Sequence, residues 1–471
     1  MNIIDYEFAF DDINDGYSKV NLAKKSESDP ISFDVSVGDS SIRLLKGNNL
    51  SSLQADLLDL AIAINFVDKL SLPKKLRSIH VHVSLPLRHP EIFELNSKML
   101  QDLLYWYTED YWSFHFQSRK SLPRESECSS SKNFDFYDFP EIVEFALWSG
   151  GLDSLAGLQT RLVDDKKKNF VLIGTGSNSI MRKTQQQVFH ALSSFPHASG
   201  RLRFLHIPIE ANYGDRYPHN QSHRARGIVF LLIGALSALS AGYKQLNVHE
   251  TGIGAINLPL PGGVGRDHSK AVHPISLIKM EKFISNVIEE EFVICNPFLF
   301  STKAEMCRSL EGYSYPTFET ISCDRLHREK YIQCGYCSSC ILRRQALASA
   351  GIKDQTKYVI PHGKRAESKH LAYWNLMNQQ IVVLEKALDS SDPYDNLCMA
   401  YINDIPDIVS DVADNAVHDE GVLKERLIQL YKKYVQEWQN VAEILFSEMT
   451  LNIKDSYFLE DGKWQQMHLI N

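Results

Sequence analysis

The feature that most constrains the fold is a glycine-containing turn between an apolar run and a helical stretch. Residues 145–148 (FALW) lead directly into residues 149–154 (SGGLDS), and leucines at 155, 158 and 162 follow with helical spacing. This pattern predicts a strand that turns into a helix at the glycines. Glycine allows positive φ and close backbone approach, and the free N–H groups of a helix's first turn favour an anion. The turn therefore predicts a phosphate-binding loop in an α/β fold.

The loop lacks the lysine that follows the glycines in the P-loops of kinases and GTPases, so we expect it to cradle a leaving pyrophosphate instead. Ser149 and Ser154 would add hydroxyl donors, and Asp153 could hold the Mg²⁺ that accompanies ATP. An ordinary glycine turn with an Asp or Ser cap is the alternative. The predicted ATP-binding residues of the loop are Ser149, Gly150, Gly151, Leu152, Asp153 and Ser154.

Short apolar runs alternate with helical stretches after residue 141, which is typical of a parallel α/β sheet. The predicted strands are 143–148, 170–175, 203–209, 245–250 and 291–296, and the predicted helices are 153–163, 183–193, 224–241 and 274–288. We therefore expect a Rossmann-like, five-stranded parallel sheet of nucleotide-binding size. Thr175 ends the second predicted strand, and we include it among the ATP-binding residues.

The regions before and after this sheet differ from it in composition and hydrophobic periodicity. Residues 1–125 mix alternating strands with helical stretches and predict an α+β domain, and residues 126–140 have the composition of a linker. The ATP-binding domain is predicted at 141–365. Residues 366–471 have charged helical periodicity, which predicts a helical cap or partner-binding region.

The charge and hydropathy of the chain argue against a nucleic-acid-binding, a secreted and a membrane-spanning protein. A formal net charge of −8 disfavours a nucleic-acid-binding surface, so small molecules or proteins are the expected partners. The N-terminus has no secretion signal, and the apolar stretch 227–242 is too short and interrupted to span a bilayer. We therefore expect a cytoplasmic protein without a membrane partner, and a homodimer is compatible with the sequence.

Four of the eight cysteines fall in one short window, and this clustering indicates metal binding in a reducing compartment. Their spacing can converge on one tetrahedral Zn²⁺, and four thiolates would leave no open position, which predicts a structural metal. An iron–sulfur cluster and four unrelated buried cysteines are the alternatives. The adjacent Arg343 and Arg344 could face substrate or be solvated. The predicted metal ligands are Cys323, Cys334, Cys337 and Cys340.

The loop resembles the signature of the PP-loop ATP pyrophosphatases, which use ATP to adenylate an oxygen atom and release pyrophosphate. Together with residues 302–305 (TKAE) and the cysteine motif, residues 141–350 resemble 7-cyano-7-deazaguanine synthase (QueC). The resemblance implies the HUP (adenine nucleotide alpha hydrolase-like) variant of the Rossmann-like fold. It also implies that 7-carboxy-7-deazaguanine is adenylated by ATP and then receives ammonia.

By the same resemblance, Lys303 would contact the ATP phosphates together with the loop, and Arg226 would match an arginine of the family's Arg-Asn-x-x-Phe helix. The next residue here is Gly227 instead of Asn. The implied catalytic residues are therefore Asp153, Lys303 and Arg226, with ATP, Mg²⁺ and Zn²⁺ as cofactors.

The long build of the chain, with Ser-x-Arg-x-Arg at 222–226 and Glu-x-Gly-x-x-x-x-Asn at 250–257, resembles the QueC-like component (QatC) of the Qat anti-phage defence cassettes. This resemblance implies a protein partner and an amine acceptor that is ammonia or that partner's amino group. Only one of Arg224 and Arg226 is expected to face the cleft, since they lie on opposite sides of a helix turn. Glu250 could contact the deazaguanine or cap a helix, and His273 could bind the carboxylate or belong to a mobile loop. The predicted substrate-binding residues are Arg224, Glu250, Asn257 and His273.

Two other functions remain open from the sequence. A tRNA-modifying PP-loop enzyme predicts a basic stripe and a catalytic cysteine pair, but the net charge is acidic and Cys295 and Cys307 are far apart. A non-catalytic assembly subunit of a defence complex is the other alternative, and the intact loop and Lys303 argue against it.

Overall fold

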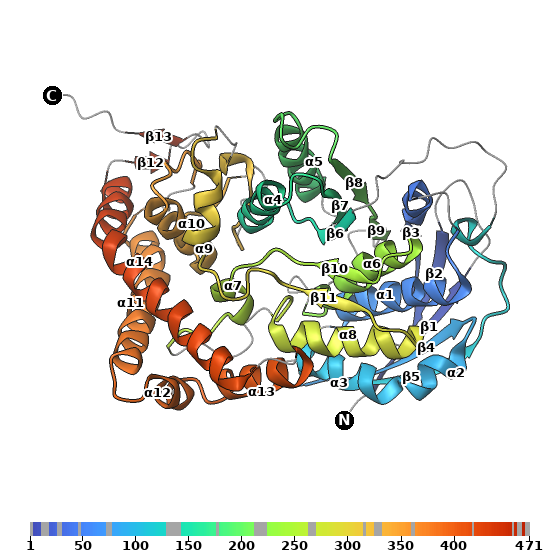
Figure 1. The fold of residues 1–471 in the computed structure, drawn as a ribbon. Coiled ribbons are helices and arrows are strands. Elements are labelled where there is room, and N and C mark those ends of the chain that lie inside the picture. Colours follow the sequence, from blue (N-terminus) through green and yellow to red (C-terminus); the bar gives the residue numbers. More distant parts are fainter. Residues whose placement is uncertain are drawn as a thin grey trace.

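The computed structural model describes residues 3–10, 18–25, 31–45, 49–71, 78–128, 143–175, 179–211, 224–261, 270–313, 317–324, 332–358, 363–416, 419–454, 456–458 and 464–466. These residues form two larger sheets, one two-stranded sheet and layers of helices between and around them (Figure 1). None of the described helices combines the length and the apolar character that crossing a membrane requires.

The central sheet is parallel and contains β6 (Val143–Leu147), β7 (Asn169–Gly174), β8 (Leu202–His206), β10 (Gln245–Asn247) and β11 (Val293–Cys295). Its spatial order is β11-β10-β6-β7-β8, which is the Rossmann arrangement. The strand order reverses between β6 and β10. In open α/β sheets ligands bind at the carboxyl ends of the strands beside such a reversal, so the loops after β6 and β10 are expected to line the site.

Helices cover both faces of this sheet, and the alternation of side chains along the strands decides which residues meet which helices. On one face lie α4 (Leu152–Asp164), α5 (Ser179–Ser193), α9 (Lys303–Cys307) and α10 (Ser338–Ser349), and on the other α6 (Arg226–Ser240) and α8 (Pro274–Ile288). Ala146 and Leu172 contact the first layer, whereas Phe145 and Val171 contact the second. Both faces are therefore buried, which explains the nearly continuous apolar runs.

The N-terminal sheet has the order β5-β4-β1-β2-β3-β9. Its strands are β1 (Ile3–Phe10), β2 (Ser18–Lys24), β3 (Ile31–Val37), β4 (His80–Leu87), β5 (Tyr111–Ser118) and β9 (Ile209–Ala211). Its helices are η1 (Asp39–Leu44), α1 (Ser52–Leu70), α2 (Pro90–Leu95), α3 (Ser97–Thr108) and η2 (Glu125–Glu127).

Pro208 divides the predicted strand 203–209. β8 ends at His206, and β9 leaves the central sheet to pair antiparallel with β3. Proline has no N–H group and cannot continue a ladder, so the chain changes sheets at this residue. A Cβ atom on Gly38 would lie 2.7 Å from Pro208 Cδ, so glycine permits the close contact at this crossing.

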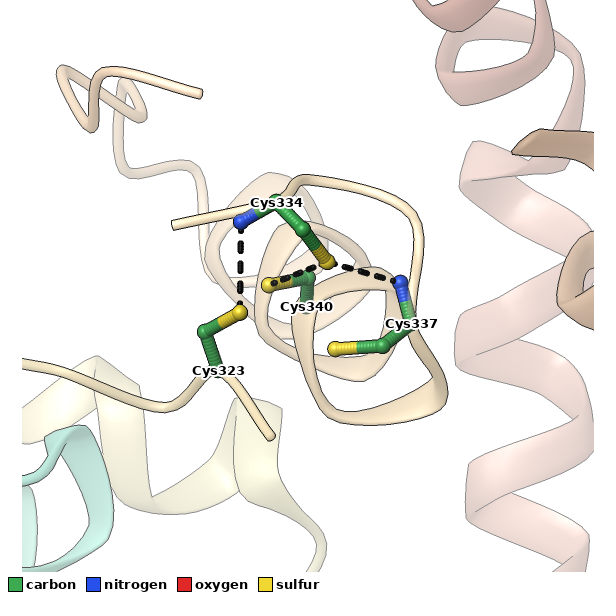
Figure 2. A group of neighbouring side chains, drawn as sticks. All are labelled: Cys323, Cys334, Cys337 and Cys340. Carbon is green, nitrogen blue, oxygen red and sulfur yellow. Dashed lines mark hydrogen bonds between the residues drawn. The ribbon is translucent and has the colours of Figure 1, made fainter. Parts of the chain in front are cut away.

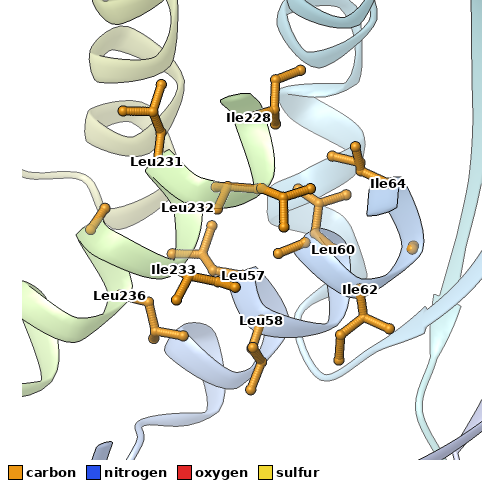
Figure 3. Close-up of a cluster of buried hydrophobic side chains, with 14 of the residues drawn as sticks. Leu57, Leu58, Leu60, Ile62, Ile64, Ile228, Leu231, Leu232, Ile233 and Leu236 are labelled. Carbon is orange, nitrogen blue, oxygen red and sulfur yellow. The ribbon is translucent and has the colours of Figure 1, made fainter. Parts of the chain in front are cut away.

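Helix α1 lies between the two sheets and is buried on nearly every side. The Ser51 side chain and Gln54 form a capping box that fixes its first turn. Figure 3 shows Leu57 and Leu60 of α1 among Leu232 and neighbouring side chains of α6. The hydrophobic core is continuous from the N-terminal sheet to the central sheet, and replacing one such leucine by alanine is expected to cost about 2–5 kcal/mol.

A buried ion-pair network fixes the chain after β5. The Asp59 carboxylate of α1 pairs with the guanidinium groups of Arg88, Arg119 and Arg124. Arg124 is 1% exposed, so the residues that lead into the predicted linker are held against α1. Residues 129–142, which hold most of that linker, lie outside the described residues.

The C-terminal region is helical, with α11 (Gly363–Leu388), α12 (Pro393–Ala400), α13 (Ile405–Ala416) and α14 (Glu420–Lys454). It ends in two short antiparallel strands, β12 (Ser456–Phe458) and β13 (Trp464–Gln466), which the helical prediction did not include. Trp374 of α11 and Trp438 of α14 stack with ring centroids 5.3 Å apart, in a core that also includes Ile256, Ile275 and Ile341 of the central domain. In Figure 1, α14 runs along α10 and α11.

The predicted fold class is confirmed: the structure is α/β, with a five-stranded parallel sheet, a cluster of four cysteines and a helical C-terminal region. The N-terminal region contains the predicted mixture of strands and helices.

Candidate functional site

The loop after β6 presents an uncapped helix terminus at the carboxyl edge of the sheet. Gly151 is the N-cap residue of α4, and among the described residues no side chain caps this helix. Ser149 Oγ lies 2.7 Å from Ser154 Oγ and accepts a hydrogen bond from the Gly151 N–H at 3.1 Å. The first-turn N–H groups of α4 are therefore available to an anion, as a pyrophosphate site requires.

Gly150 needs to be glycine for two reasons. Its φ is 71°, in the left-handed region, and a Cβ atom would lie 3.0 Å from the Cα atom of Gln185. Gln185, on α5, donates from Nε2 to the Trp148 carbonyl at 3.0 Å, and Trp148 Nε1 donates to the Gln185 carbonyl at 3.0 Å. These bonds lock the backbone before the loop onto α5.

Asp153 and Lys303 meet beside this loop, and Glu250 lies near enough to interact electrostatically with both. Lys303 Nζ donates to Asp153 Oδ2 at 2.6 Å, while the buried Asp153 Oδ1 has no hydrogen-bond partner among the described residues. Burial opposes the charge on Lys303, but Asp153 and Glu250 outweigh it and raise the pKa of Lys303. Burial, then the charge of Asp153, raise the pKa of Glu250. Lys303 thus pairs with Asp153, and the Glu250 carboxyl group interacts electrostatically with both. Carboxylate oxygens suit a divalent cation.

Lys303 is placed by the start of α9. Thr302 is the N-cap residue, and it forms a capping box with Glu305: Thr302 Oγ1 accepts from the Glu305 N–H at 3.1 Å, and Glu305 Oε2 accepts from the Thr302 N–H at 2.9 Å. This reciprocal pair fixes the first turn, in which Lys303 is the first residue. Lys303 is 6% exposed.

Glu250 does not cap a helix. The N-cap residue of α7 (Gly252–Ile256) is Thr251, whose Oγ1 accepts from the Gly254 N–H at 3.1 Å. A Cβ atom on Gly254 would lie 2.3 Å from Glu250 Oε1, so glycine leaves space for this carboxylate. The capping alternative for Glu250 is therefore wrong, and its carboxyl group interacts electrostatically with Asp153 and Lys303.

The two arginines before and in α6 have different surroundings. Arg224 forms an ion pair with Asp110, which follows α3 of the N-terminal region. Arg226 is exposed and lies over the Phe230 ring, with 4.8 Å from its guanidinium carbon to the ring centroid. Of the two, Arg226 is the one that remains accessible.

Helix α6 is closely approached at Gly227, where the sequence-based resemblance expected an asparagine. A Cβ atom on Gly227 would lie 2.6 Å from Ala271 Cα. Tyr107 of α3 donates to the Ala271 carbonyl at 3.1 Å, which holds this segment against α6. The contact therefore depends on the N-terminal region.

The remaining predicted residues are more dispersed. Thr175 is buried directly after β7, at the same edge of the sheet as the loop. Asn257 ends α7 with φ of 49° and ψ of 54°. His273 Nδ1 accepts from the Ile275 N–H at 3.3 Å as the N-cap of α8, and its ring lies 5.5 Å from that of Trp106. Burial and the nearby Lys270 lower the pKa of His273 to about 3.

The four predicted cysteines come together at the start of α10 (Figure 2). Their sulfur atoms all lie within 4.8 Å of one another, and Cys334 Sγ lies 3.9 Å from Cys340 Sγ. Tetrahedral thiolate ligation of Zn²⁺ places sulfur atoms about 3.8 Å apart, given Zn–S bonds of about 2.3 Å. Cys334 Sγ also accepts from the Cys337 N–H at 3.2 Å. This group could bind a single metal ion such as zinc.

Arg343 and Arg344 are not solvated, so that alternative is wrong for both. Arg343 is 0% exposed and donates to Thr320 Oγ1 at 2.7 Å and to Thr356 Oγ1 at 2.9 Å. Arg344 is also buried and lies 5.1 Å from the Tyr358 ring centroid. Arg343 thus ties α10 to the segments on either side of the cysteines.

Sequence reasoning missed Glu437 of α14, which is buried and accepts from Thr302 Oγ1 at 2.9 Å. A signal was present, since Glu437 is a carboxylate on the otherwise apolar helix face that carries Tyr434 and Trp438. It also missed Lys69 at the end of α1. Burial and then the charge of Arg226 lower the pKa of Lys69 to about 8.

Comparison with known proteins identifies the part of the chain that carries Lys303 and the cysteines. Residues 274–351 match the family model of the queuosine biosynthesis protein QueC. This segment is QueC-like. The 7-cyano-7-deazaguanine synthase of Methanococcus maripaludis strain C6 is 48% identical over 48 residues, and that of strain C5 is 46% identical over 48 residues. Each alignment covers 10% of this chain and 18% of the relative.

The QueC-like segment runs from α8 through α9 to α10. It includes Lys303, the capping residue Thr302 and all four cysteines, whereas Asp153 and Glu250 lie before it. The structure joins the two parts at the contact between Lys303 and Asp153.

Proposed function

We propose that this chain is a QueC-like, ATP-dependent enzyme that adenylates the carboxylate of a 7-deazaguanine of the 7-carboxy-7-deazaguanine type and transfers the acyl group to an amine. The observation that carries the proposal is the contact between Lys303 and Asp153, because it joins the QueC-like segment to the phosphate loop. The unpartnered Asp153 Oδ1 and the adjacent Glu250 support it.

The chemistry has two steps. A carboxylate oxygen of the substrate attacks the α-phosphorus of ATP, the bond from that phosphorus to the bridging oxygen breaks, and pyrophosphate leaves. The amine nitrogen then attacks the acyl carbon, AMP leaves with the electron pair of the C–O bond, and the nitrogen loses a proton to give an amide. Both steps depend on positioning and charge neutralisation more than on acid–base groups of the protein.

The residues of the site could supply the positioning and the charge neutralisation that both steps require. The first-turn N–H groups of α4, with Ser149 and Ser154, would hold the departing pyrophosphate, and Lys303 would neutralise its charge. Arg226, exposed at the start of α6, would supply a second cation.

The donor sets suit the two expected metals. Asp153 and Glu250 would hold Mg²⁺, which neutralises phosphate charge when bound, and the effect of the Asp153 charge on Glu250 supports this donor pair. This position favours a metal role for Glu250 over the predicted contact with the base. The four cysteines would hold Zn²⁺ as a structural ion that fixes the start of α10.

We further propose that the enzyme works in an anti-phage defence system, with ammonia or an amino group of a protein partner as the acceptor. This part rests on the resemblance of the long build and of the motifs at 222–226 and 250–257 to the Qat component. The C-terminal helices, which contact α9 and α10, are the proposed place for a partner to act.

A tRNA-modifying enzyme is less well supported. Its predicted catalytic thiols would be Cys295 and Cys307, but Cys307 is fully buried in α9. Burial, then the charge of Asp153, raise the pKa of Cys307 to about 12, which opposes the thiolate that such chemistry needs.

The test incubates the full chain with Mg-ATP, 7-carboxy-7-deazaguanine and ammonium, and measures AMP and pyrophosphate. The wild type should form both, and Asp153→Ala should form less than about 1% of the wild-type amounts, as expected for loss of a main electrostatic group. Formation only when tRNA is added would support the tRNA-modifying alternative. No product with the wild type, or equal amounts with Asp153→Ala, would contradict the proposed activity.

A further inference from the structure

The hydroxyl of Thr302 connects the C-terminal helix α14 to the short helix that carries Lys303. Thr302 Oγ1 donates to Glu437 Oε1 at 2.9 Å and accepts from the Glu305 N–H at 3.1 Å. Both Thr302 and Glu437 are buried. A hydroxyl has a single proton, so its donation to Glu437 leaves the oxygen lone pairs for the capping bond.

Two further contacts join α14 to α9. Lys433 Nζ donates to Glu305 Oε1 at 2.6 Å, and Arg308 Nη2 donates to Glu437 Oε1 at 3.1 Å. Both members of the capping box, Thr302 and Glu305, are therefore held from outside by α14. With five residues, α9 makes few internal hydrogen bonds, so its geometry depends on such external contacts.

Helix α14 is held in place by its packing in the C-terminal core. Trp438, the residue after Glu437, is buried, stacks on Trp374 and donates from Nε1 to Asn378 Oδ1 at 2.9 Å. Tyr434, one turn earlier, is also buried in the C-terminal core. The carboxylate of Glu437 is thus presented from a packed helix surface.

We propose that Glu437 is a positioning residue for Lys303. It orients the Thr302 hydroxyl, the hydroxyl fixes the first turn of α9, and that turn directs Lys303 towards Asp153. The C-terminal region is then part of the ATP site's construction. The kinetic consequences rest on the proposed function, while the conformational consequence does not.

The first test is hydrogen–deuterium exchange of the full chain without nucleotide. Glu437→Ala should speed exchange in residues 302–307 about tenfold, as expected for loss of a hydrogen bond to a charged group. Glu437→Gln keeps an acceptor oxygen and should restore most of the protection. Glu425→Ala, on the exposed face of α14, is the matched control and should change nothing in this segment.

The second test is kinetic and uses pyrophosphate release. Glu437→Ala should raise the KM for ATP about tenfold and leave the KM for the 7-deazaguanine unchanged. The reason is that Lys303 is proposed to contact the phosphates of ATP and not the 7-deazaguanine. A merely destabilised protein would lose active molecules and keep both KM values. In a Lys303→Ala background, Glu437→Ala should have no additional effect on the KM for ATP, since the two residues act through one contact.

Unchanged exchange in residues 302–307 of Glu437→Ala would overturn the proposal, and so would equal changes in both KM values. If the wild type releases no pyrophosphate, the proposed function fails, but the exchange experiment still decides whether Glu437 fixes α9.

Discussion

Asp153 and Lys303 are 150 residues apart in the sequence, and their side chains meet at 2.6 Å. Asp153 comes from the first turn of α4, the helix after the first strand of the central sheet, and Lys303 from the first turn of the helix after the last. Replacing Lys303 by alanine should reduce kcat/KM for ATP by about 10²–10³, since it removes a buried cation directed at the phosphates. Pyrophosphate release measures this, with Lys386→Ala on the exposed face of α11 as the control. Equal rates for the two variants would exclude Lys303 from the site.

Glu250 makes the stability of the nucleotide-free protein depend on pH. Burial, then Asp153, raise its pKa from 4.5 to about 8, so the folded state binds a proton that the unfolded state releases earlier. The stabilisation that this proton on Glu250 gives the folded state is fully present below about pH 4.5 and is lost as the pH rises to about 8. Glu250→Gln should therefore lose less stability than the wild type between pH 5 and 8. Thermal unfolding of both proteins at these pH values measures the difference, and parallel curves would contradict it.

Gly150 and Gly200 offer a matched pair for the loop. Both have positive φ, 71° and 77°, but a Cβ atom on Gly150 would meet Gln185 at 3.0 Å, whereas a Cβ atom on Gly200 would meet nothing within 4 Å. Each alanine substitution should cost about 1–2 kcal/mol of backbone strain. Gly150→Ala should in addition weaken ATP binding, and isothermal titration with Mg-ATP would detect this. Equal ATP affinity of the two variants would show that the loop does not hold the nucleotide.

The cysteine group should hold one metal ion per chain. Elemental analysis of the purified protein should find about one equivalent of zinc, and Cys340→Ser should lower it sharply, because four-thiolate sites tolerate loss of a ligand poorly. Cys128→Ser, on an exposed residue outside the group, is the control. Iron in place of zinc would change the metal assignment, and metal retained equally in both variants would contradict the assignment of these ligands.

The central sheet and the cysteine group could be predicted because their determinants are local. Each strand of the sheet is a short apolar run next to a turn, and Cys334, Cys337 and Cys340 lie within seven residues of one another. The assignment of Lys303 to the same site as Asp153 came from the resemblance of residues 141–350 to the QueC family, not from a local pattern. Pro208 also carried a local signal, but its consequence, a strand that changes sheets, depends on the position of β3.

The surroundings of the site could not be predicted, because they depend on contacts between distant segments. Nothing near Arg224 in the sequence indicates that Asp110 pairs with it, and nothing near Thr302 indicates Glu437. The placement of Glu250 beside Asp153 likewise follows from the pairing of β10 with β6, which a single strand does not specify.

Transfer of an oxygen label from the substrate to AMP tests the central claim most directly. The full chain would be incubated with Mg-ATP, ammonium and 7-carboxy-7-deazaguanine labelled with ¹⁸O in its carboxylate, and AMP would be analysed by mass spectrometry. If the carboxylate attacks the α-phosphorus, AMP gains one ¹⁸O atom, and Asp153→Ala forms almost none of this product. Unlabelled AMP, or ADP and phosphate in place of AMP and pyrophosphate, would contradict adenylation of the carboxylate.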